Sequence, residues 1–217
     1  MYAYSFSVWV FVVIGHDPVF PVSLPFLQPG MRVGLYGGSF NPPHEGHRLV
    51  AQTALKRLEL DRVWWIVTPG NPLKGTSELK PLEERMAACR QVAADPRITV
   101  TGFEQQLGTQ YTIDALEYID KRYPEVSFVW LMGADSLVSF HLWRGWRKIA
   151  RLMPIAVIDR PKSTLKATQS SAAQFLKNYR LPSFQAKALM GRVPPCWVFL
   201  YGARSNMSST LLRSQGK

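Results

Sequence analysis

The chain contains little cysteine: Cys89 and Cys196 are the only two among its 217 residues. They form no CxxC pair and no Cys/His cluster, which excludes a disulfide framework and argues against a structural zinc site. Cys89 falls in a helical pattern and Cys196 at the start of a strand pattern. We therefore expect two buried, reduced thiols in a cytoplasmic protein.

The chain also lacks a recognisable membrane span or secretory signal. The apolar stretch at residues 1–14 is too short to cross a bilayer, and neither a basic segment nor a convincing small-residue cleavage site accompanies it. Prolines then predict an extended, non-helical stretch before Met31, where the first clear strand begins. Residues 1–30 are thus expected to be an extension of unknown role. Either Met31 lies near the functional start, or the segment packs on the body or mediates self-association, which leaves a homo-oligomer open.

Acidic residues are few relative to basic ones: 15 Asp and Glu stand against 26 Lys and Arg, for a formal net charge of +11. The basic residues form no block and no zinc-finger, RRM or basic-zipper pattern. Two kinds of polyanion could explain the excess, namely nucleic acids or small molecules such as nucleotides. Binding of a triphosphate is sufficient, so we expect no nucleic-acid partner and keep a nucleic-acid-binding module as a distant alternative.

The apolar pattern predicts one α/β domain. Hydrophobic residues make up 47% of the chain, which is ample for a buried core at this length. Strand patterns at residues 33–36, 63–67, 98–100, 126–132, 155–158 and 197–201 alternate with helical patterns at 82–94, 112–122, 137–152, 172–179 and 208–213, with a break near Gly145. This order predicts a doubly wound parallel sheet with its ligand crevice beyond the carboxyl ends of the strands. Residues 161–194 are expected to form a small C-terminal subdomain.

The most informative segment is GGSFNPPHEGH, residues 37–47, directly after the first strand. A strand, a glycine turn and a helix start place free N–H groups and a positive helix dipole where phosphates bind. His44 and His47 are three residues apart and should share one face of the first helical turn. The segment is neither a GxxxxGK[ST] loop nor a GxGxxG turn. Two histidines at a phosphate cradle, without a nearby acid nucleophile, indicate chemistry on a phosphoanhydride; a capping histidine and a packed one are the structural alternative.

Other segments should reach the same crevice, because each follows a strand or precedes a helix. Lys74 lies on a proline-stiffened loop, where it could hold a phosphate or be solvated. Thr112 could cap its own helix or offer its hydroxyl and N–H to a ligand carboxylate. Asp135, after a glycine, could cap the next helix or accept hydrogen bonds from ribose hydroxyls. Trp143 could stack on a flat heterocycle or belong to the core.

A second candidate anion site is the segment SSTLLR, residues 208–213, near the carboxyl end. Ser208 or Ser209 would cap a helix whose first N–H groups face outward, and Arg213 lies four residues beyond Ser209 on the same face. Hydroxyls, free amides and a guanidinium would together clamp an oxyanion. One triphosphate could then bridge the two helix N-termini.

Five segments resemble, in this order, those of the bacterial nicotinate-nucleotide adenylyltransferases: GGSFNPPHEGH, TPGNPLK, YTIDAL, LMGADSLVSFHLWRGW and SSTLLR. The first carries the (H/T)xGH signature of the nucleotidylyltransferase superfamily in its GGSFxPxHxGH form. The resemblance covers roughly residues 31–213, is weakest over 161–194 and does not extend to the first 30 residues. It implies a Rossmann-like nucleotidylyltransferase domain over residues 31–217.

The resemblance implies transfer of the adenylyl group of ATP to nicotinate mononucleotide, giving deamido-NAD and pyrophosphate in NAD biosynthesis. It also implies the site residues. Contacts to ATP would come from Gly38, Ser39, Phe40, His44, His47, Asp135, Ser209, Thr210 and Arg213, of which His44, His47 and Arg213 would be catalytic. Lys74, Thr112 and Trp143 would lie on the nicotinate nucleotide side, with Trp143 stacked on the pyridine ring.

The implied reaction needs no protein nucleophile, since the 5′-phosphate of the mononucleotide attacks the α-phosphorus of ATP in line. Catalysis would then rest on position and electrostatics. Mg²⁺ should bind mainly through the ATP phosphates, because Glu45 and Asp135 are the acids in these motifs, and no protein metal ligands are expected. Adjacent phosphates would favour the cationic form of one of the two histidines.

Other substrates stay open, namely nicotinamide mononucleotide or phosphopantetheine as the adenylyl acceptor. The segment GADSLVSFHLWRGW argues against the phosphopantetheine enzymes, which resemble a shorter chain with a different second half. Thr112 and the basic balance favour the carboxylate of nicotinate over the amide of nicotinamide. A dinucleotide-binding oxidoreductase is a further alternative. It is disfavoured because GxGxxG is absent and Thr68 and Pro69 stand where an acidic residue would follow the second strand.

Overall fold

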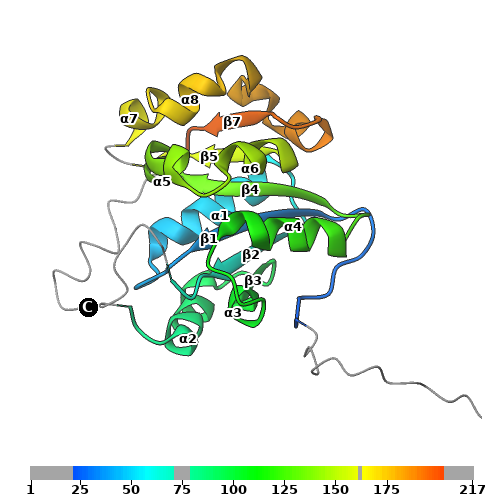
Figure 1. The fold of residues 1–217 in the computed structure, drawn as a ribbon, viewed down its shortest axis with the longest axis vertical. Coiled ribbons are helices and arrows are strands. Elements are labelled where there is room, and N and C mark those ends of the chain that lie inside the picture. Colours follow the sequence, from blue (N-terminus) through cyan, green and yellow to red (C-terminus); the bar gives the residue numbers. More distant parts are fainter. Residues whose placement is uncertain (1–21, 71–78, 161–162, 203–217) are drawn as a thin grey trace, which may run out of the picture.

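The fold is a parallel β-sheet covered by helices on both faces, as the computed structural model shows for residues 22–70, 79–160 and 163–202 (Figure 1). Within these residues the sheet has seven strands in the order β3-β2-β1-β4-β5-β7-β6, and every neighbouring pair is parallel. The strands are β1 (Arg32–Gly38), β2 (Arg62–Val67), β3 (Ile98–Thr101), β4 (Ser127–Gly133), β5 (Ile155–Ile158), β6 (Arg180–Leu181) and β7 (Trp197–Leu200).

Helices connect these strands. The α-helices are α1 (Glu45–Arg57), α2 (Leu82–Ala93), α3 (Phe103–Gln106), α4 (Thr112–Arg122), α5 (Ala134–Ser139), α6 (Trp146–Leu152), α7 (Thr164–Thr168) and α8 (Ser171–Phe175). Three 3₁₀ segments, η1 (Phe140–Leu142), η2 (Lys177–Tyr179) and η3 (Ser183–Gly191), complete the described elements. The predicted helix at 208–213 lies outside the described residues.

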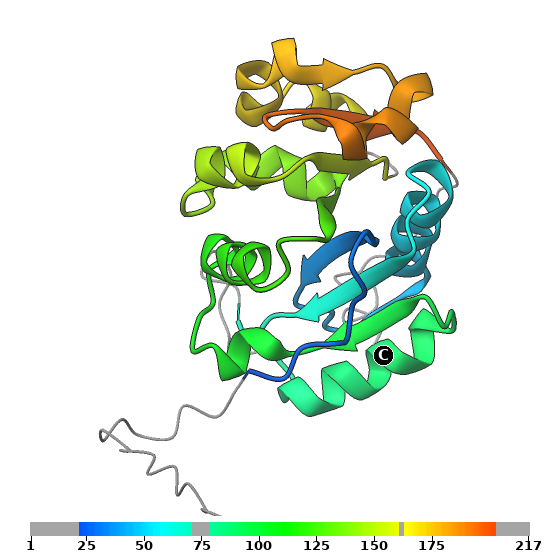
Figure 2. The ribbon, with the colours of Figure 1, turned by 90° about the vertical axis from the view of Figure 1, so that its right-hand side faces the viewer.

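Burial on both faces of the sheet explains the continuous apolar run of β2. Trp64 and Trp65 are adjacent and both fully buried, yet they belong to different cores. Trp64 packs in the core that contains Leu116 of α4, and Trp65 packs in the core that contains Ala54 of α1. Successive strand residues point to opposite faces, so a strand between two helical layers must be apolar throughout. Figure 2 shows these layers on the two sides of the sheet, and the doubly wound α/β prediction is confirmed.

The element boundaries follow the sequence pattern where that pattern is periodic. The predicted helix at 112–122 has the bounds of α4, and the predicted break near Gly145 is the start of α6, where Gly145 takes a left-handed φ of 66°. The predicted helix at 137–152 is instead divided into α5, η1 and α6. Residues 161–194 were predicted as a small subdomain; within their described part, β6 extends the same sheet beside β7.

Residues 22–30, the described part of the predicted extension, pack on the body. Leu27 is buried in the core on the α4 side of the sheet. The Tyr123 hydroxyl donates to the Pro25 carbonyl at 2.9 Å, and the Gly30 N–H donates to the Glu125 carbonyl at 2.7 Å. Packing on the body, one of the two hypotheses for this segment, therefore holds for residues 22–30. Residues 1–21 lie outside the described part of the chain.

Both cysteines are free and buried, as predicted. Burial raises the pKa of the Cys89 thiol to about 12 and that of the Cys196 thiol to about 11, so both are protonated and unreactive near neutral pH. None of the helices in the described ranges is both long and apolar enough to cross a bilayer.

Replacing Leu116 by alanine tests the role of α4 as a cover for the sheet. Leu116 is fully buried, so we expect Leu116→Ala to lower the free energy of unfolding by about 2–5 kcal/mol. Asp120→Ala, at an exposed position of the same helix, should change it by less than about 0.5 kcal/mol. Urea unfolding of the three proteins measures both values. Similar losses in the two variants would contradict this placement of α4.

Candidate functional site

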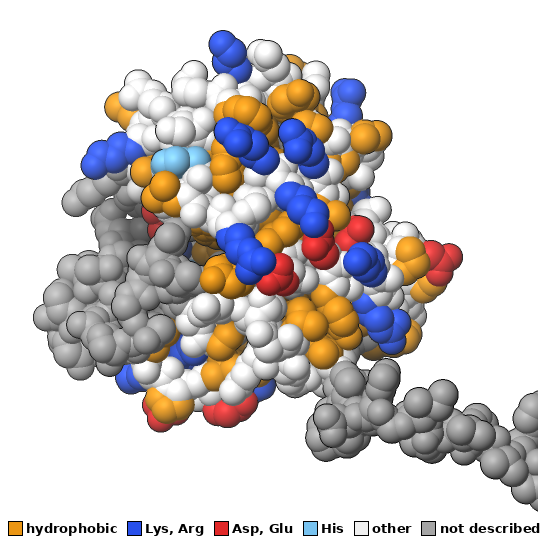
Figure 3. Space-filling model, viewed as in Figure 1, with side chains coloured by type: hydrophobic (Ala, Val, Ile, Leu, Met, Phe, Trp, Pro, Cys, Tyr) orange, Lys and Arg blue, Asp and Glu red, His pale blue; other side chains and the backbone are white. Residues whose placement is uncertain are grey.

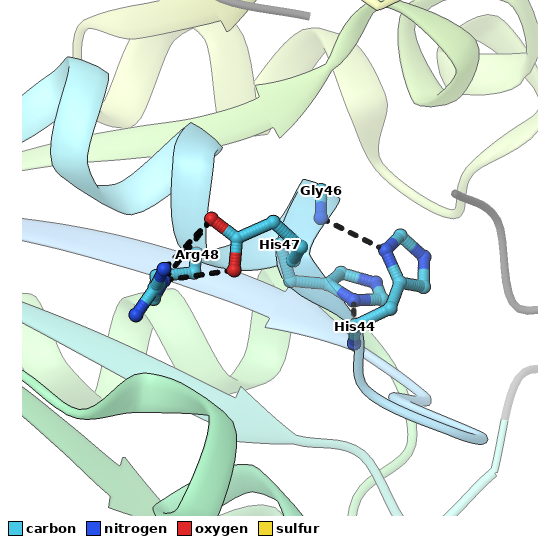
Figure 4. Close-up of polar contacts among 5 residues, drawn as sticks. His44, Gly46, His47 and Arg48 are labelled. Carbon is cyan, nitrogen blue, oxygen red and sulfur yellow. Dashed lines mark hydrogen bonds and ion pairs between the residues drawn. The ribbon is translucent and has the colours of Figure 1, made fainter. Parts of the chain in front are cut away.

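The turn between β1 and α1 holds the two histidines through the start of the helix. The Gly46 N–H donates to Nδ1 of His44 at 3.0 Å, and the His44 N–H donates to Nδ1 of His47 at 3.1 Å (Figure 4). His44 is the N-cap of α1 and His47 its third residue, so two imidazoles form the reciprocal capping box usually made by Ser or Thr and Glu. The ring centroids are 3.9 Å apart. The structural alternative considered for these residues, a capping histidine and a packed one, is therefore present: His44 caps α1, and His47 packs against Phe40.

These hydrogen bonds also decide the tautomer of both rings. A ring nitrogen that accepts an N–H carries no proton, so each neutral imidazole has its hydrogen on Nε2. Burial, followed by the charge of Arg160, lowers the pKa of His44 to about 4. Burial, followed by His44 and Arg160, lowers the pKa of His47 well below 6.5. The sequence predicted that phosphates would favour one cationic ring, whereas hydrogen bonds and burial here favour two neutral Nε2–H donors.

Phe40 forms the packed base under this turn. Its side chain is 1% exposed, stacks on Trp65 at a centroid distance of 5.1 Å and lies 4.8 Å from the His47 ring. Its φ of 46° is left-handed, an arrangement that costs about 1–3 kcal/mol in a non-glycine residue and persists where packing enforces it. The ring of Phe40 is thus part of the core, so a contact of Phe40 with ATP, as predicted, would have to come from its backbone.

Arg85 of α2 joins this turn to the loop after β2. Its guanidinium, in a side chain only 3% exposed, donates to the carbonyls of Ser39 at 2.7 Å, Thr68 at 2.8 Å and Lys80 at 2.8 Å. The Thr68 N–H also donates to the Gly38 carbonyl at 3.0 Å. The sequence analysis missed Arg85. The available signal was an arginine on the face of α2 that carries Cys89, where only apolar residues would be expected.

Asp135 pairs with a second arginine, the half-buried Arg160. Nη1 of Arg160 donates to Oδ2 of Asp135 at 3.1 Å, while Nη2 of Arg160 is buried without a hydrogen-bond partner in the described part of the chain. Asp135 does not cap α5, since the N-cap is Gly133. A Cβ on Gly133 would lie 2.4 Å from Oδ1 of Asp135, so the glycine makes room for this pair. Arg160, two residues after the end of β5, was also missed in the sequence analysis.

Thr112 and Trp143 are brought to one corner. Thr112 is the first residue of α4, and the N-cap is Tyr111, so Thr112 does not cap its own helix. Its N–H is one of the helix donors without an intrahelical partner. The guanidinium of Arg144, next to Trp143, lies 4.4 Å from the centre of the Tyr111 ring. Trp143 is half-buried, with its edge contacts to Trp130 and Phe140, so part of the indole stays exposed.

Exposed ion pairs link α4 to the segment around α6 at this corner. Nη1 of Arg144 lies 3.9 Å from Oδ2 of Asp114, and Lys148 pairs with Glu117. Figure 3 shows Lys and Arg side chains beside Asp and Glu on this face of the molecule. Ile113 packs close to Gly145 at the same corner: a Cβ atom on residue 145 would lie 3.4 Å from Cγ1 of Ile113.

Four predicted site residues lie outside the described residues: Lys74, Ser209, Thr210 and Arg213. Their roles, and the second oxyanion clamp with them, stay predictions. In the described ranges no group of three or more His, Cys, Asp and Glu side chains could hold a metal ion. The two carboxylates of the predicted motifs are both paired, Asp135 with Arg160 and Glu45 with Arg48.

The described site is suited to anionic groups. It combines two Nε2–H donors, the N-terminus of a 13-residue helix and the unpartnered Nη2 of Arg160. Each favours a phosphate oxygen, and burial strengthens the electrostatic part. The rings of His44 and His47 use Nδ1 for the backbone, so neither can take a proton there without losing a capping hydrogen bond.

Comparisons with known proteins agree with this geometry. The cytidylyltransferase-like family model matches residues 35–215. A Rhizobium johnstonii protein is 53% identical over 191 residues, covering 88% of this chain and 96% of its own. A Methylorubrum extorquens protein is 56% identical over 185 residues, covering 85% of this chain and all of its own. Both are named "Probable nicotinate-nucleotide adenylyltransferase".

A solved structure shares the fold. Plasmodium falciparum nicotinic acid mononucleotide adenylyltransferase complexed with NaAD superposes with a TM-score of 0.64 at 16% sequence identity, covering 85% of this chain and 83% of that one. At this identity the likeness concerns the fold alone.

The histidine tautomers can be tested by ¹⁵N NMR of the ligand-free protein. We expect both rings to be protonated on Nε2 only and to stay so as the pH falls from about 8 to about 6, because their folded-state pKa values lie below the ordinary value. Unfolding lets His44 take up a proton that the folded form excludes. The free energy of unfolding should therefore fall as the pH drops from about 6.5 toward about 4.

His44→Asn is the matched control for this pH dependence. Its side-chain oxygen can still accept the Gly46 N–H, but it does not titrate, so the fall in stability should be smaller. A resonance of His44 or His47 that titrates with a midpoint near 6.5 would contradict the assignment of two neutral rings.

Proposed function

This chain belongs to the cytidylyltransferase-like family and, within it, to the nicotinate-nucleotide adenylyltransferases, and we propose on this basis that it transfers the adenylyl group of ATP to nicotinate mononucleotide. The products are deamido-NAD and pyrophosphate, in NAD biosynthesis. The observation that carries the proposal is the pair of Nε2–H donors at the N-terminus of α1, in the electrostatic field of Arg160, whose buried Nη2 has no partner among the described residues.

In the proposed reaction the 5′-phosphate of the mononucleotide attacks the α-phosphorus of ATP, and the bond to the pyrophosphate oxygen breaks. Two polyanions must meet, so the protein has to hold them against their repulsion; positioning of this kind is worth up to about 7–11 kcal/mol. His44 and His47 donate to phosphate oxygens as neutral groups and need not exchange a proton. The N-terminus of α1 and Arg160 supply positive potential.

The proposal assigns the other predicted residues to the two substrates. Gly38, Ser39 and Asp135 lie on the ATP side together with Ser209, Thr210 and Arg213, while Lys74, Thr112 and Trp143 serve the mononucleotide. ATP enters with Mg²⁺ on its phosphates, so the ion is part of the substrate. We assign the activity to residues 31–217 and place the protein in the cytoplasm.

The carboxylate of nicotinate is proposed to meet the free N–H of Thr112 beside Trp143. An amide in its place would put an N–H₂ group or a neutral oxygen against that donor, and the mismatch of a buried polar pair is what discriminates such analogues. Nicotinamide mononucleotide is therefore the poorer acceptor. Phosphopantetheine, the second alternative, has no flat ring for Trp143.

Pyrophosphate release with MgATP and a panel of acceptors tests the function. We expect turnover with nicotinate mononucleotide, a kcat/KM lower by about 10-fold or more with nicotinamide mononucleotide, and none with phosphopantetheine. Omission of the acceptor controls for ATP hydrolysis. The proposal would be refuted if phosphopantetheine were the only acceptor that gave turnover, or if no acceptor of the panel gave any.

His47→Asn separates the two roles of this histidine. The asparagine oxygen can still accept the His44 N–H, so the melting temperature should stay close to that of the unchanged protein, whereas the distal donor is lost. We expect kcat to fall by about 100- to 1,000-fold, as for loss of one donor to a developing charge. His47→Gln, whose amide reaches toward the position of Nε2, should recover part of it. Equal turnover in His47→Asn and the unchanged enzyme would remove the Nε2–H from the mechanism.

A further inference from the structure

Glu104 on α3 is a buried carboxyl that the proposed chemistry does not use. Its side chain is 4% exposed, and its Oε2 has no hydrogen-bond partner among the described residues. The residue lines a groove of about 810 Å³ together with Pro69, Tyr111 and Arg144. The groove adjoins the corner that holds Thr112, and its wall at Pro69 is the loop that follows β2.

The Thr68 hydroxyl connects Glu104 to that loop. This hydroxyl donates to the Gly70 carbonyl at 2.7 Å, and the Glu104 carboxyl lies against the same hydroxyl. A hydroxyl has one hydrogen to give. That hydrogen can go either to the Gly70 carbonyl or to an ionised Glu104 carboxylate, whereas a protonated Glu104 can donate to the Thr68 oxygen and leave the hydrogen on Gly70.

Thr68 is in turn fixed to the histidine turn by its backbone. Its N–H donates to the Gly38 carbonyl at 3.0 Å, and its carbonyl accepts from Nη1 of Arg85, which also donates to the Ser39 carbonyl. A shift of Thr68 would therefore change the geometry of the hydrogen bonds that position the turn before His44. The loop after β2 also begins the segment TPGNPLK, which the proposed function places on the mononucleotide side.

We propose that Glu104 is a positioning residue which, as a neutral carboxylic acid, holds the Thr68–Gly70 loop in the form that binds the mononucleotide, and that losing its proton to water weakens that binding. This role depends on the function proposed above. The ionised carboxylate can only accept, so it competes with the Gly70 carbonyl for the single hydrogen of Thr68. It would also leave a charge in a site where Oε2 has no partner, which is unfavourable.

In the described part of the chain no cation forms an ion pair with Glu104. Arg85 of α2 donates to three carbonyls. Residues 22–30 and the loop 68–70 have no charged side chain. The other charged groups of the groove are Asp114, Glu117, Lys121 and Arg144, of which Asp114 pairs with Arg144, and Glu117 with Lys148. Burial raises the pKa of Glu104 to about 7, partly offset by the Thr68 hydroxyl.

The test is the KM for nicotinate mononucleotide from pH 6 to pH 8.5 in the unchanged enzyme and in Glu104→Gln. With a pKa near 7, about one molecule in ten is protonated at pH 8, so KM should rise by up to about 10-fold relative to pH 6. Glu104→Gln keeps a neutral donor and should show a low, nearly constant KM. Because the phosphate of the substrate itself titrates in this range, the ratio of the two KM values at each pH is the quantity compared.

Glu117→Gln is the matched control, since it removes a carboxylate from the same groove without touching Thr68. It should keep the pH profile of the unchanged enzyme, and kcat should vary little among the three proteins at saturating substrate. Glu104→Ala should raise KM at every pH, with rescue only by glutamine. A KM ratio that is constant across pH, or a Glu104→Gln enzyme as weak as Glu104→Ala, would overturn the role of Glu104. Absence of turnover in the unchanged enzyme would instead overturn the proposed function.

Discussion

Two backbone N–H groups at the start of α1 determine which chemistry the site can support. They bind Nδ1 of His44 and Nδ1 of His47 and so place both ring protons on Nε2. The rings become rigid hydrogen-bond donors rather than bases, which suits stabilisation of phosphate oxygens and disfavours proton abstraction. Packing and capping both hold the rings in place: Phe40 packs against His47 and Trp65, and the two imidazoles form the N-terminal cap of α1.

Two arginines, one buried and one half-buried, organise the loops at the carboxyl edge of the sheet. Among the described residues Arg85 pairs with no carboxylate and donates to three carbonyls that belong to separate segments of the chain. Such a cation stabilises the relative position of those segments, because removing any one carbonyl leaves a buried donor unsatisfied. Arg160 is different: one of its nitrogens is on Asp135 and another has no partner in the described ranges, so it retains capacity for an anionic ligand. Arg85 thus fixes protein segments relative to one another, whereas Arg160 can still donate a hydrogen bond to a ligand.

Regular elements were predictable from the sequence, and the polar connections between them were not. The run around Trp64 and Trp65 and the helix 112–122 follow from burial and periodicity, which are local properties. Short elements such as α3 and β6 contain too few residues for a period, and tertiary contacts decide them. Arg85, Glu104 and Arg160 were missed because their partners are carbonyls, a hydroxyl or a distant carboxylate, which no spacing along the chain reveals. The histidines were found through their motif, but their tautomers required the backbone geometry.

The corner formed by α4 and the segment around α6 is held by two kinds of contact, exposed ion pairs and an apolar contact of the buried Ile113. Arg144–Asp114 and Lys148–Glu117 are exposed to solvent, so added electrolyte screens them over a Debye length of about 8–10 Å. Ile113 and Gly145, packed beneath, are apolar and insensitive to electrolyte. Ionic strength can therefore weaken the ion pairs at the outer rim of this corner, where Arg144 covers Tyr111, while the apolar contact between Ile113 and Gly145 beneath is retained.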